Sequence, residues 1–342
     1  MSRPASLPLA HLDAMTDERG LFEHCRFDVP RPEHGYCLDD AARALIVLMR
    51  EPSDTPVTRR LIEVCFRLVD RAVVGDGRVH NRMSPTGEWT DDAGLGDWWG
   101  RALWALGFVA AHGRETTLRD RALAAFRRAG SARSVHVRAL AFAALGAAEV
   151  CLVQPDDPNA RAILRDAAAV LAVDGPSAPW QWPEPRLRYA NASLAEALLA
   201  AGTTLDDERL LDRGLAMLRF LLDIETRDGH LSVTGVEGRG PGERDVQFDQ
   251  QPIEVAAIAD ACSRAYDLTA DPIWRDHVGV AWAWFEGDND SGARLFDADT
   301  GAGYDGLTAG GRNENRGAES TLAALGTYQQ ARRTGVLDRV SP

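Results

Sequence analysis

Carboxylate side chains recur in this chain where a loop passes into an apolar, helix-forming segment. Asp40 begins one such segment with Arg43 one turn later, and Glu184 stands beside Trp180 and Trp182 in PWQWPEP. Hydrolysis of a glycosidic bond needs two carboxyl groups, one that holds a proton and one that is ionised. Apolar aromatic surroundings favour a protonated carboxyl, and a helix N-terminus favours an ionised one. We therefore predict Glu184 as the catalytic acid and Asp40 as the base.

Two further acids compete for either catalytic role. Asp249 and Glu254 flank the start of a later apolar segment. An acid at a helix N-terminus also has a plain structural role, because it caps the helix and stabilises it by about 0.5–2 kcal/mol. Each of these carboxylates, taken alone, fits that role. Several of them at one end of one fold favour a shared site.

Side chains suited to sugar rings and hydroxyl groups accompany these acids. Amides and guanidinium groups form hydrogen bonds with hydroxyls, and flat aromatic rings pack against apolar faces. The predicted substrate-binding residues are Tyr36, Asp39, Arg43, Asn81, Asp97, Trp98, Arg101, Trp180, Trp182, Gln250, Gln251, Tyr304, Asp305, Asn315, Arg316 and Glu319. Ordinary explanations stay open for some of them: core packing for Trp180 and Trp182, and an i,i+4 ion pair for Asp97 with Arg101.

Helical periodicity predicts the elements that must position these residues. A polar loop runs into an Ala/Leu-rich helix at 35–49, 96–111, 133–148, 179–202, 247–262 and 314–328. More charged amphipathic segments follow at about 56–74, 115–129, 158–173, 206–224 and 271–286. The Ala- and Gly-rich helices suit a closely packed inner ring, and the charged ones suit an outer ring that faces solvent. The pattern predicts an all-α fold, an (α/α)6 barrel whose inner helices begin at one common end.

The loops before the inner helices are long, which marks that end of the barrel as the active-site end. They cover 75–97, 174–187, 225–250 and 287–314. Loops of this length in a compact domain are usually functional. We expect short β-hairpins in two of them, at 230–236 and 293–304. An open α-solenoid is the alternative fold, but the uneven spacing of the helices disfavours it.

Composition limits the classes of partner. We expect an N-terminal arm at 1–34, a single toroid domain at 35–336 and a tail at 337–342. The 342 residues carry a net charge of −13 with no basic stripe, which disfavours nucleic acid. The sequence has no run suited to a membrane span and no secretion signal, so we expect a cytoplasmic protein. The five cysteines lack paired spacing, so we expect no disulfide, no metal site and no cofactor. Oligomeric state is open.

Several motifs together resemble a family of six-hairpin, (α/α)6 glycosidase-like proteins. They are GYCLDDAARALI, WWGRALWALG, WQWPEPRLRY, QFDQQPIEVAA, YDGL and NRGAESTLA, and the resemblance covers about residues 34–330. Members of the family stand alone or are fused to glycosyltransferase domains, often alongside mannoside-processing enzymes. The resemblance implies a sugar site at the inner-helix N-termini, with Asp39, Asp40, Glu184, Asp249, Glu254, Asp305 and Glu319 matching motif acids. The chain departs from the family pattern at GLGDWWGR and at Ala190, where an acid is usual. The adjacent Asp39 and Asp40 are also similar to the paired aspartates of endo-α-1,6-mannanases.

These observations give one leading hypothesis for function and two alternatives. The leading hypothesis is an inverting glycoside hydrolase acting on a mannoside or related oligosaccharide. A sugar isomerase or epimerase on the same barrel is the first alternative, although such enzymes usually need paired histidines and only His34, His80 and His136 lie near the junctions. A non-catalytic carbohydrate-binding module is the second. A terpene cyclase is disfavoured because the amide-rich lining is too polar for its substrate.

Overall fold

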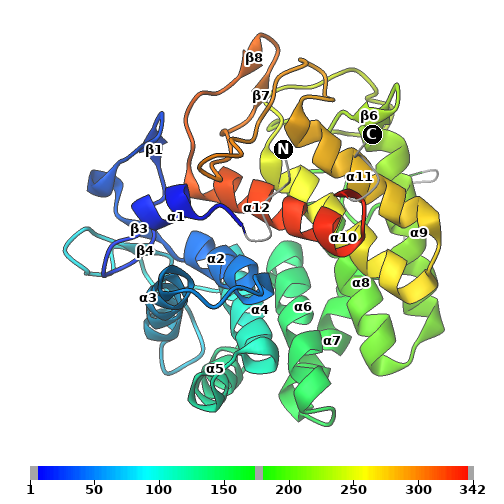
Figure 1. Ribbon diagram of the computed structural model, residues 1–342. Coiled ribbons are helices and arrows are strands. Elements are labelled where there is room, and N and C mark those ends of the chain that lie inside the picture. The colour runs from blue at the N-terminus through cyan, green and yellow to red at the C-terminus, as the bar shows by residue number, and fades with distance from the viewer. Residues whose placement is uncertain (1–6, 174–179, 338–342) are drawn as a thin grey trace.

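Six helices form a closed inner ring in the computed structural model, which describes residues 7–173 and 180–337. They are α2 (Leu38–Arg50), α4 (Asp97–His112), α6 (Val137–Val153), α8 (Ala192–Leu205), α10 (Pro252–Thr269) and α12 (Ala318–Arg333). Each contacts the next, and α12 contacts α2, so the ring closes (Figure 1). The predicted (α/α)6 barrel is confirmed, and the open solenoid is excluded by the contact between the last inner helix and the first.

The outer helices alternate with the inner ones along the chain. They are α3 (Pro56–Ala72), α5 (Thr116–Ala129), α7 (Pro158–Leu171), α9 (Glu208–Glu225) and α11 (Pro272–Glu286), and each packs on the inner helix that precedes it. All begin and end within a few residues of the predicted segments. Their apolar stripes face the inner ring and their charged faces point outward, as the amphipathic pattern requires.

Small residues let the inner helices approach closely. A side-chain carbon added at Gly107 of α4 would collide with the backbone carbonyl of Gly146 of α6, and one at Gly146 would collide with the carbonyl of Leu103. The two helices therefore touch backbone to backbone. This contact explains why the inner segments of the sequence are rich in Ala and Gly.

The two rings differ in how their helices begin. Most outer helices carry their own side-chain cap: Thr55 caps α3, Asp157 caps α7, Asp207 caps α9 and Asp271 caps α11. None of the inner helices, all of which lie in the described part of the chain, has a cap from its own N-cap side chain. The acids at the starts of the inner helices are therefore available for other contacts.

The loops at the end where the inner helices begin contain short antiparallel strand pairs. The pairs are β1 (Cys25–Arg26) with β2 (Val29–Pro30), β3 (Tyr36–Cys37) with β4 (Arg82–Met83), β5 (Thr226–Arg227) with β6 (His230–Leu231), and β7 (Leu307–Thr308) with β8 (Gly311–Arg312). The hairpin expected at 230–236 starts earlier, because the chain turns at Asp228 and Gly229, both with positive φ. The one expected at 293–304 is reduced to a single bridge between Phe296 and Gly303.

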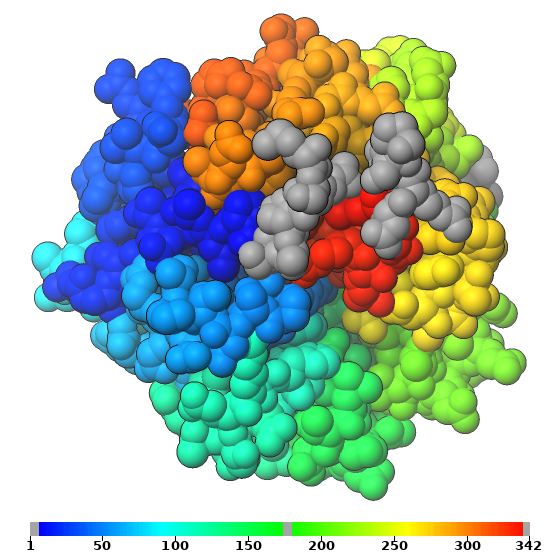
Figure 2. All heavy atoms as spheres, viewed as in Figure 1, coloured from blue at the N-terminus to red at the C-terminus, as the bar shows by residue number. Residues whose placement is uncertain are grey.

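The N-terminal arm packs on the barrel. It contains α1 (Ala10–Ala14) and the 3-10 turn η1 (Pro32–His34), and it lies between the first helical hairpin and the loop before α12 (Figure 2). Asp13 forms an ion pair with Arg60 of α3 at 2.6 Å, and the backbone N–H of His11 donates to the carbonyl of Thr300. Of the expected tail at 337–342, all but Leu337 lies outside the described residues, as do residues 1–6 of the arm and the start of the 174–187 loop.

All five cysteines are free and buried. No helix in the described ranges is long and apolar enough to cross a membrane.

Candidate functional site at the inner-helix N-termini

Two neighbouring cavities open where the inner helices begin. One of about 330 Å³ lies over the starts of α2, α10 and α12, and we call it the acidic cavity. The other, of about 850 Å³, lies over the starts of α4, α6, α8 and α10, and we call it the wide cavity. Gln251, the residue before α10, lines both. The two cavities therefore adjoin at this residue.

The acidic cavity has more carboxyl groups than cations. Its lining includes the carboxyl groups of Glu23, Asp39, Asp40, Asp305 and Glu319, the guanidinium groups of Arg43 and Arg82, and the imidazole of His24. Arg43 forms ion pairs with Asp40 at 2.7 Å and with Glu319 at 2.6 Å, and Arg82 pairs with Glu23. Two guanidinium groups cannot neutralise five carboxylates, so at least one carboxyl group should keep its proton.

Burial raises the pKa values of three carboxyl groups in the acidic cavity. Desolvation raises the pKa of Asp40 to about 7, with further increase from the charges of Glu319 and Glu23 and an opposing effect of Arg43. The pKa values of Asp39 and Asp305 are also raised, again first by burial. Asp40 is only 2% exposed, and it lies on the first turn of α2, so its carboxyl is held in place.

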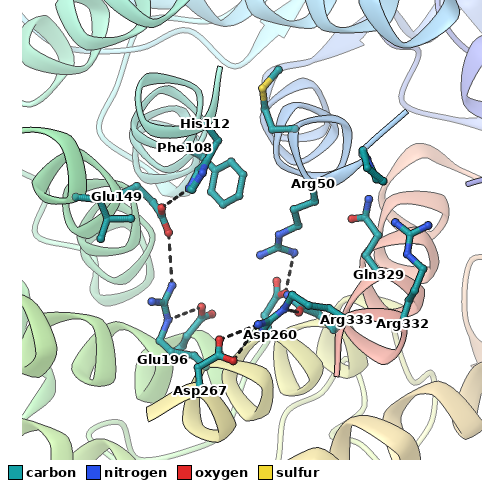
Figure 3. A pocket seen from close by; sticks show the side chains of 15 residues that line it. Arg50, Phe108, His112, Glu149, Glu196, Asp260, Asp267, Gln329, Arg332 and Arg333 are labelled. Carbon is teal, nitrogen blue, oxygen red and sulfur yellow. Dashed lines mark hydrogen bonds and ion pairs between the residues drawn. The ribbon is translucent and has the colours of Figure 1, made fainter. Parts of the chain in front are cut away.

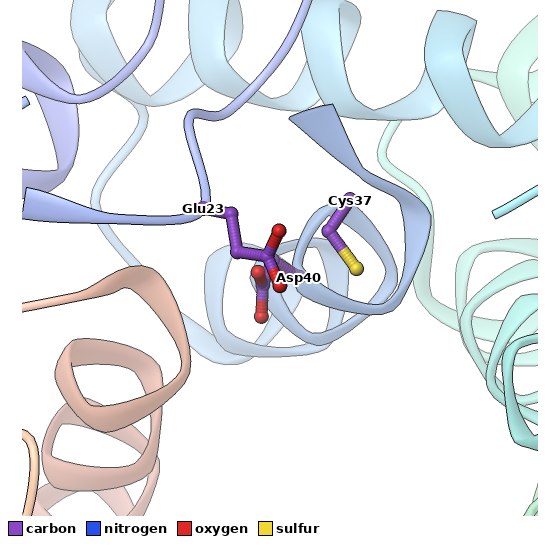
Figure 4. A group of neighbouring side chains, drawn as sticks. All are labelled: Glu23, Cys37 and Asp40. Carbon is purple, nitrogen blue, oxygen red and sulfur yellow. The ribbon is translucent and has the colours of Figure 1, made fainter. Parts of the chain in front are cut away.

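Glu23 and Asp40 face one another at close range (Figure 4). One carboxylate oxygen of each and the Cys37 thiol lie within 4.8 Å of one another. Such a triad could in principle bind a metal ion. Here Glu23 already pairs with Arg82, and burial raises the pKa values of Asp40 and Cys37, which disfavours the ionised forms that a metal needs. The group fits proton exchange better than metal binding.

Ion pairs and unpaired acceptors line the wide cavity. Glu184 Oε1 accepts from Arg138 at 2.7 Å, while its buried Oε2 has no partner among the described residues. Tyr189 donates its hydroxyl hydrogen to Asp97. A buried oxygen without a partner at a cavity wall is a common sign of a missing ligand or water.

Glu254 lines the wide cavity and also holds the start of α8 in place. Its carboxylate accepts from the backbone N–H groups of Ala190 and Asn191 and from the Asn191 side chain, so it caps α8 from the neighbouring helix. Burial, followed by the charge of Glu225, raises the pKa of Glu254 to about 8. Glu225 is fully buried at the end of α9, and its pKa is raised as well. The sequence offered no sign of this carboxyl pair, because Glu225 belongs to an outer helix.

The structure gathers part of the predicted set in these cavities. Asp39, Asp40, Arg43, Gln251, Asp305 and Glu319 line the acidic cavity, and Asp97, Glu184, Gln251 and Glu254 line the wide one. Arg101 lies deeper, along the barrel axis. Its guanidinium stacks 4.0 Å from the Phe142 ring, and its Nε is 3.8 Å from Asp39.

The predicted aromatic residues do not line either cavity. Trp182 is fully buried, and Trp180 packs edge-on against Phe220 and donates to the backbone carbonyl of Glu184. The Trp98 indole N–H donates to the backbone carbonyl of Val79. Trp180 and Trp182 thus match the core-packing alternative, and none of the three rings lines either cavity.

Tyr36 and Tyr304 are likewise occupied elsewhere. Tyr36 stacks on Phe22 and donates to Asp17 at 2.6 Å. Tyr304 lies between two guanidinium groups, and its hydroxyl accepts from Arg316 at 3.1 Å. Both phenol groups therefore stabilise the packing of the loops.

The remaining predicted polar residues hold loops together or face solvent. Gln250 is fully buried and bonds to Asp290, and Asn81 accepts from the Cys37 thiol. Asn315 accepts from the backbone of Phe27, which ties the arm to the loop before α12. Asp249 is exposed and lines neither cavity.

Residues that the sequence did not single out complete the site. Glu23 and His24 come from the arm, and Arg82 comes from the 75–97 loop. Arg138 and Tyr189 contribute to the wide cavity. Of these residues, only Glu23 could have been suspected from the sequence, because it lies near the end of the arm. Arg82 could not, because no spacing in the sequence relates residue 82 to residue 37.

No protein-family model and no curated protein matches the chain. Solved structures with the same fold include a sugar epimerase from a ruminal bacterium, with 12% identity, a TM-score of 0.70 and coverage of 97% of this chain and 95% of that one. The cellobiose 2-epimerase of Bacillus thermoamylovorans has 11% identity and a TM-score of 0.69, covering 93% and 95%. A GH76 α-mannanase from Bacteroides thetaiotaomicron has 13% identity and a TM-score of 0.60, covering 89% and 88%. At these identities the likeness establishes the fold, and it is the barrel that the motif resemblance implies.

Proposed function

We propose that the chain is a carbohydrate-active enzyme that hydrolyses a glycosidic bond in the acidic cavity. One observation carries the proposal: Asp40, a buried carboxyl whose pKa burial raises to about 7, lies beside Glu23, whose carboxyl group pairs with Arg82. Two carboxyl groups in unlike protonation states at close range are what glycosidic bond cleavage requires. The assignment differs from the sequence hypothesis, which gave the acid role to Glu184.

In this mechanism Asp40 donates its proton to the leaving oxygen while the bond from that oxygen to the anomeric carbon breaks. Positive charge then develops on the sugar ring, and the surplus of carboxylates around it stabilises that charge. The separation of Glu23 and Asp40, within 4.8 Å, is closer to the roughly 5–5.5 Å of retaining enzymes than to the roughly 6.5–9.5 Å of inverting ones. We therefore favour attack by Glu23 on the anomeric carbon, followed by hydrolysis of the glycosyl ester by a water whose proton goes to Asp40.

The wide cavity would hold further units of an oligosaccharide. It is large enough for more than one ring, and it offers the free Oε2 of Glu184, the Asp97–Tyr189 pair and Gln251 to hydroxyl groups. A mannoside is the first substrate to test, because the motifs resemble a mannoside-linked family and a mannanase shares the fold.

The test is to incubate the protein with manno-, gluco-, galacto- and arabino-oligosaccharides and to follow products by NMR from the first minutes. We expect release of a sugar whose initial anomer matches that of the substrate. Asp40→Asn and Glu23→Gln should each lower the rate by orders of magnitude, while Glu314→Gln, an exposed acid at the same end that lines neither cavity, should not. Equal turnover by Asp40→Asn and the parent chain would contradict the assignment.

A sugar epimerase or isomerase is the second candidate, and one observation favours it. The His24 imidazole lines the acidic cavity, and two of the solved structures that share the fold are epimerases. Proton abstraction next to a carbonyl would exchange a carbon-bound hydrogen of a reducing sugar with solvent. Incubation in D2O separates the two chemistries, since a hydrolase releases sugar without carbon-bound deuterium and an epimerase incorporates it.

A further inference from the structure

A third cavity lies at the opposite end of the barrel, and the proposed chemistry does not use it. It has a volume of about 600 Å³ (Figure 3). The last turns of α2, α4, α6 and α12 line it, together with Glu196 from the second turn of α8 and residues from the middle and end of α10. We call it the far cavity. Its floor carries Arg50 of α2, Glu149 of α6, Glu196 of α8, and Asp260 and Arg264 of α10, while Met49, Phe108 and Leu152 supply apolar contacts.

The charged groups of this floor leave one negative charge unmatched. Arg264 Nε lies 3.1 Å from Glu196 and its Nη2 lies 3.7 Å from Glu149, and Arg50 pairs with Asp260 at 2.8 Å. Two guanidinium groups thus face three carboxylates. The His112 ring donates to the Glu149 carboxylate at 2.8 Å. Arg332 also lines the cavity, and it pairs at 3.4 Å with Glu51, a buried carboxylate that does not line it. The half-exposed pair of Arg333 and Asp267 at the rim is balanced.

One carboxylate oxygen of this floor has no partner. Glu196 is 2% exposed, and its Oε1 bonds to Arg264, but its Oε2 bonds to nothing in the described ranges. A buried carboxylate oxygen without a donor lowers the stability of the fold, so such an atom usually binds a ligand or carries a proton. The C-terminal turns of α2, α4, α6 and α12 also meet this cavity, and carbonyl groups at helix C-termini favour positive charge.

We propose that the far cavity binds a small ligand that carries a protonated amine, with the ammonium group donating to Glu196 Oε2 and the carbon chain lying against Phe108, Met49 and Leu152. The ammonium supplies both the missing donor and the missing positive charge. A neutral alcohol would supply only the donor, and a carboxylate would supply neither.

The ionisation of Glu196 provides a signature for this site. Burial raises the pKa of Glu196 to about 7, with Asp260 raising it further and Arg264 and Arg50 opposing the shift. A bound ammonium favours the ionised carboxylate, so binding should release a proton near neutral pH. Affinity should rise about tenfold between pH 6 and pH 8, because the ionised fraction rises about tenfold over that range. The His112–Glu149 pair faces the same floor.

The experiment is a calorimetric titration with butylammonium, 1-butanol and butyrate at pH 8, repeated at pH 6 and in buffers of different ionisation enthalpy. We expect saturable binding of butylammonium alone, with proton release at pH 7. NMR signals of the His112 ring, followed at pH 8, should shift only with butylammonium.

Matched variants make the result specific to the Glu196 carboxylate. Glu196→Gln keeps the shape but removes the charge, and it should weaken butylammonium binding about tenfold or more, the loss expected for one charged hydrogen bond. Asp267→Asn, at the rim of the same cavity, should bind nearly as well as the parent chain. Equal binding of 1-butanol, or unchanged affinity in Glu196→Gln, would overturn the proposal. If Glu196→Gln does not fold, the absence of proton release on binding to the parent chain would overturn it equally.

Discussion

Asp40 is the residue on which the proposed chemistry depends. Its carboxyl is buried on the first turn of α2, and its pKa of about 7 results from desolvation and from the neighbouring charges of Glu319 and Glu23, in opposition to Arg43. A general acid works best when its pKa lies near the working pH. Helix position alone would have lowered this pKa, so the surrounding side chains decide the protonation state.

The pH profile of the reaction should reflect this residue. The acid form of Asp40 is the active one, so kcat/KM is expected to fall as the pH rises through about 7. The measurement is initial rate against pH from 5 to 9 on the best oligosaccharide. His24→Asn should keep the falling limb, and Asp40→Asn should remove it together with most of the rate. A limb that disappears in His24→Asn instead would assign it to the imidazole.

Glu254 should make folding stability depend on pH. Its pKa of about 8 in the folded chain lies above the ordinary value, so the folded state holds a proton that the unfolded state has released above about pH 4.5. Its contribution to stability is therefore greatest at low pH and is lost as the pH rises toward 8. We expect the free energy of unfolding to fall between pH 6 and pH 8. In Glu254→Gln the slope of this fall should be smaller than in the parent chain, by up to about 1.4 kcal/mol per pH unit.

Urea denaturation at pH 6, 7 and 8 measures this slope. Glu243→Gln is the matched control, because Glu243 is exposed and its pKa is lowered by Arg186, so it stays ionised throughout the range. Parallel slopes for Glu254→Gln and the parent chain would show that Glu254 does not hold the proton.

At the scale of elements, the contact between α4 and α6 determines how tightly the inner ring closes. Gly107 and Gly146 lie where the two backbones touch, and no side chain fits between them. The same two helices carry Asp97, Arg101 and Arg138 at their starts. A shift of this contact would therefore move residues of the wide cavity.

Gly107→Ala should destabilise the fold, because the added carbon meets the carbonyl of Gly146 and the helices must separate. Overpacking of this kind costs about 1–3 kcal/mol, and more where backbone rather than a side chain has to move. The change in the urea midpoint measures it. Gly310→Ala is the control, since nothing lies within 4 Å of an added carbon there, and its midpoint should match that of the parent chain.

At the scale of the whole molecule, the N-terminal arm is part of the site. It carries Glu23 into the acidic cavity and fastens itself to both ends of the barrel chain, through Arg60 and through the loop before α12. The ring closes between α12 and α2, and the arm lies beside the first helical hairpin and the loop before α12 (Figure 2). The arm thus contacts both the first and the last part of the barrel and at the same time places Glu23 in the acidic cavity.

Deletion of residues 1–34 should therefore lower the melting temperature and abolish turnover. Glu23→Gln should abolish turnover while the melting temperature stays close to that of the parent chain, because the ion pair with Arg82 is partly exposed. Differential scanning calorimetry and the NMR assay provide the two readouts. Full activity of the truncated chain would exclude the arm from the chemistry.

The sequence by itself determined the helices and their arrangement in rings. Apolar residues at helical spacing predicted each element, and the Ala- and Gly-rich segments identified the inner ring. The long loops identified the end that holds the acidic and wide cavities. It also placed Asp39, Asp40, Glu184 and Glu254 at that end. These properties follow from local periodicity and from the direction of each helix, both of which can be read along the chain.

Only the tertiary structure decided which of these groups meet and which are buried. Pairing of β3 with β4 places Arg82 opposite Cys37, and the fold of the arm brings Glu23 to Asp40. Trp180 and Trp182, which next to Glu184 looked suited to a sugar, pack into the core instead. A carboxyl pKa is determined by burial and by charges from distant parts of the chain, so the roles of acid and base depend on contacts that no local pattern contains.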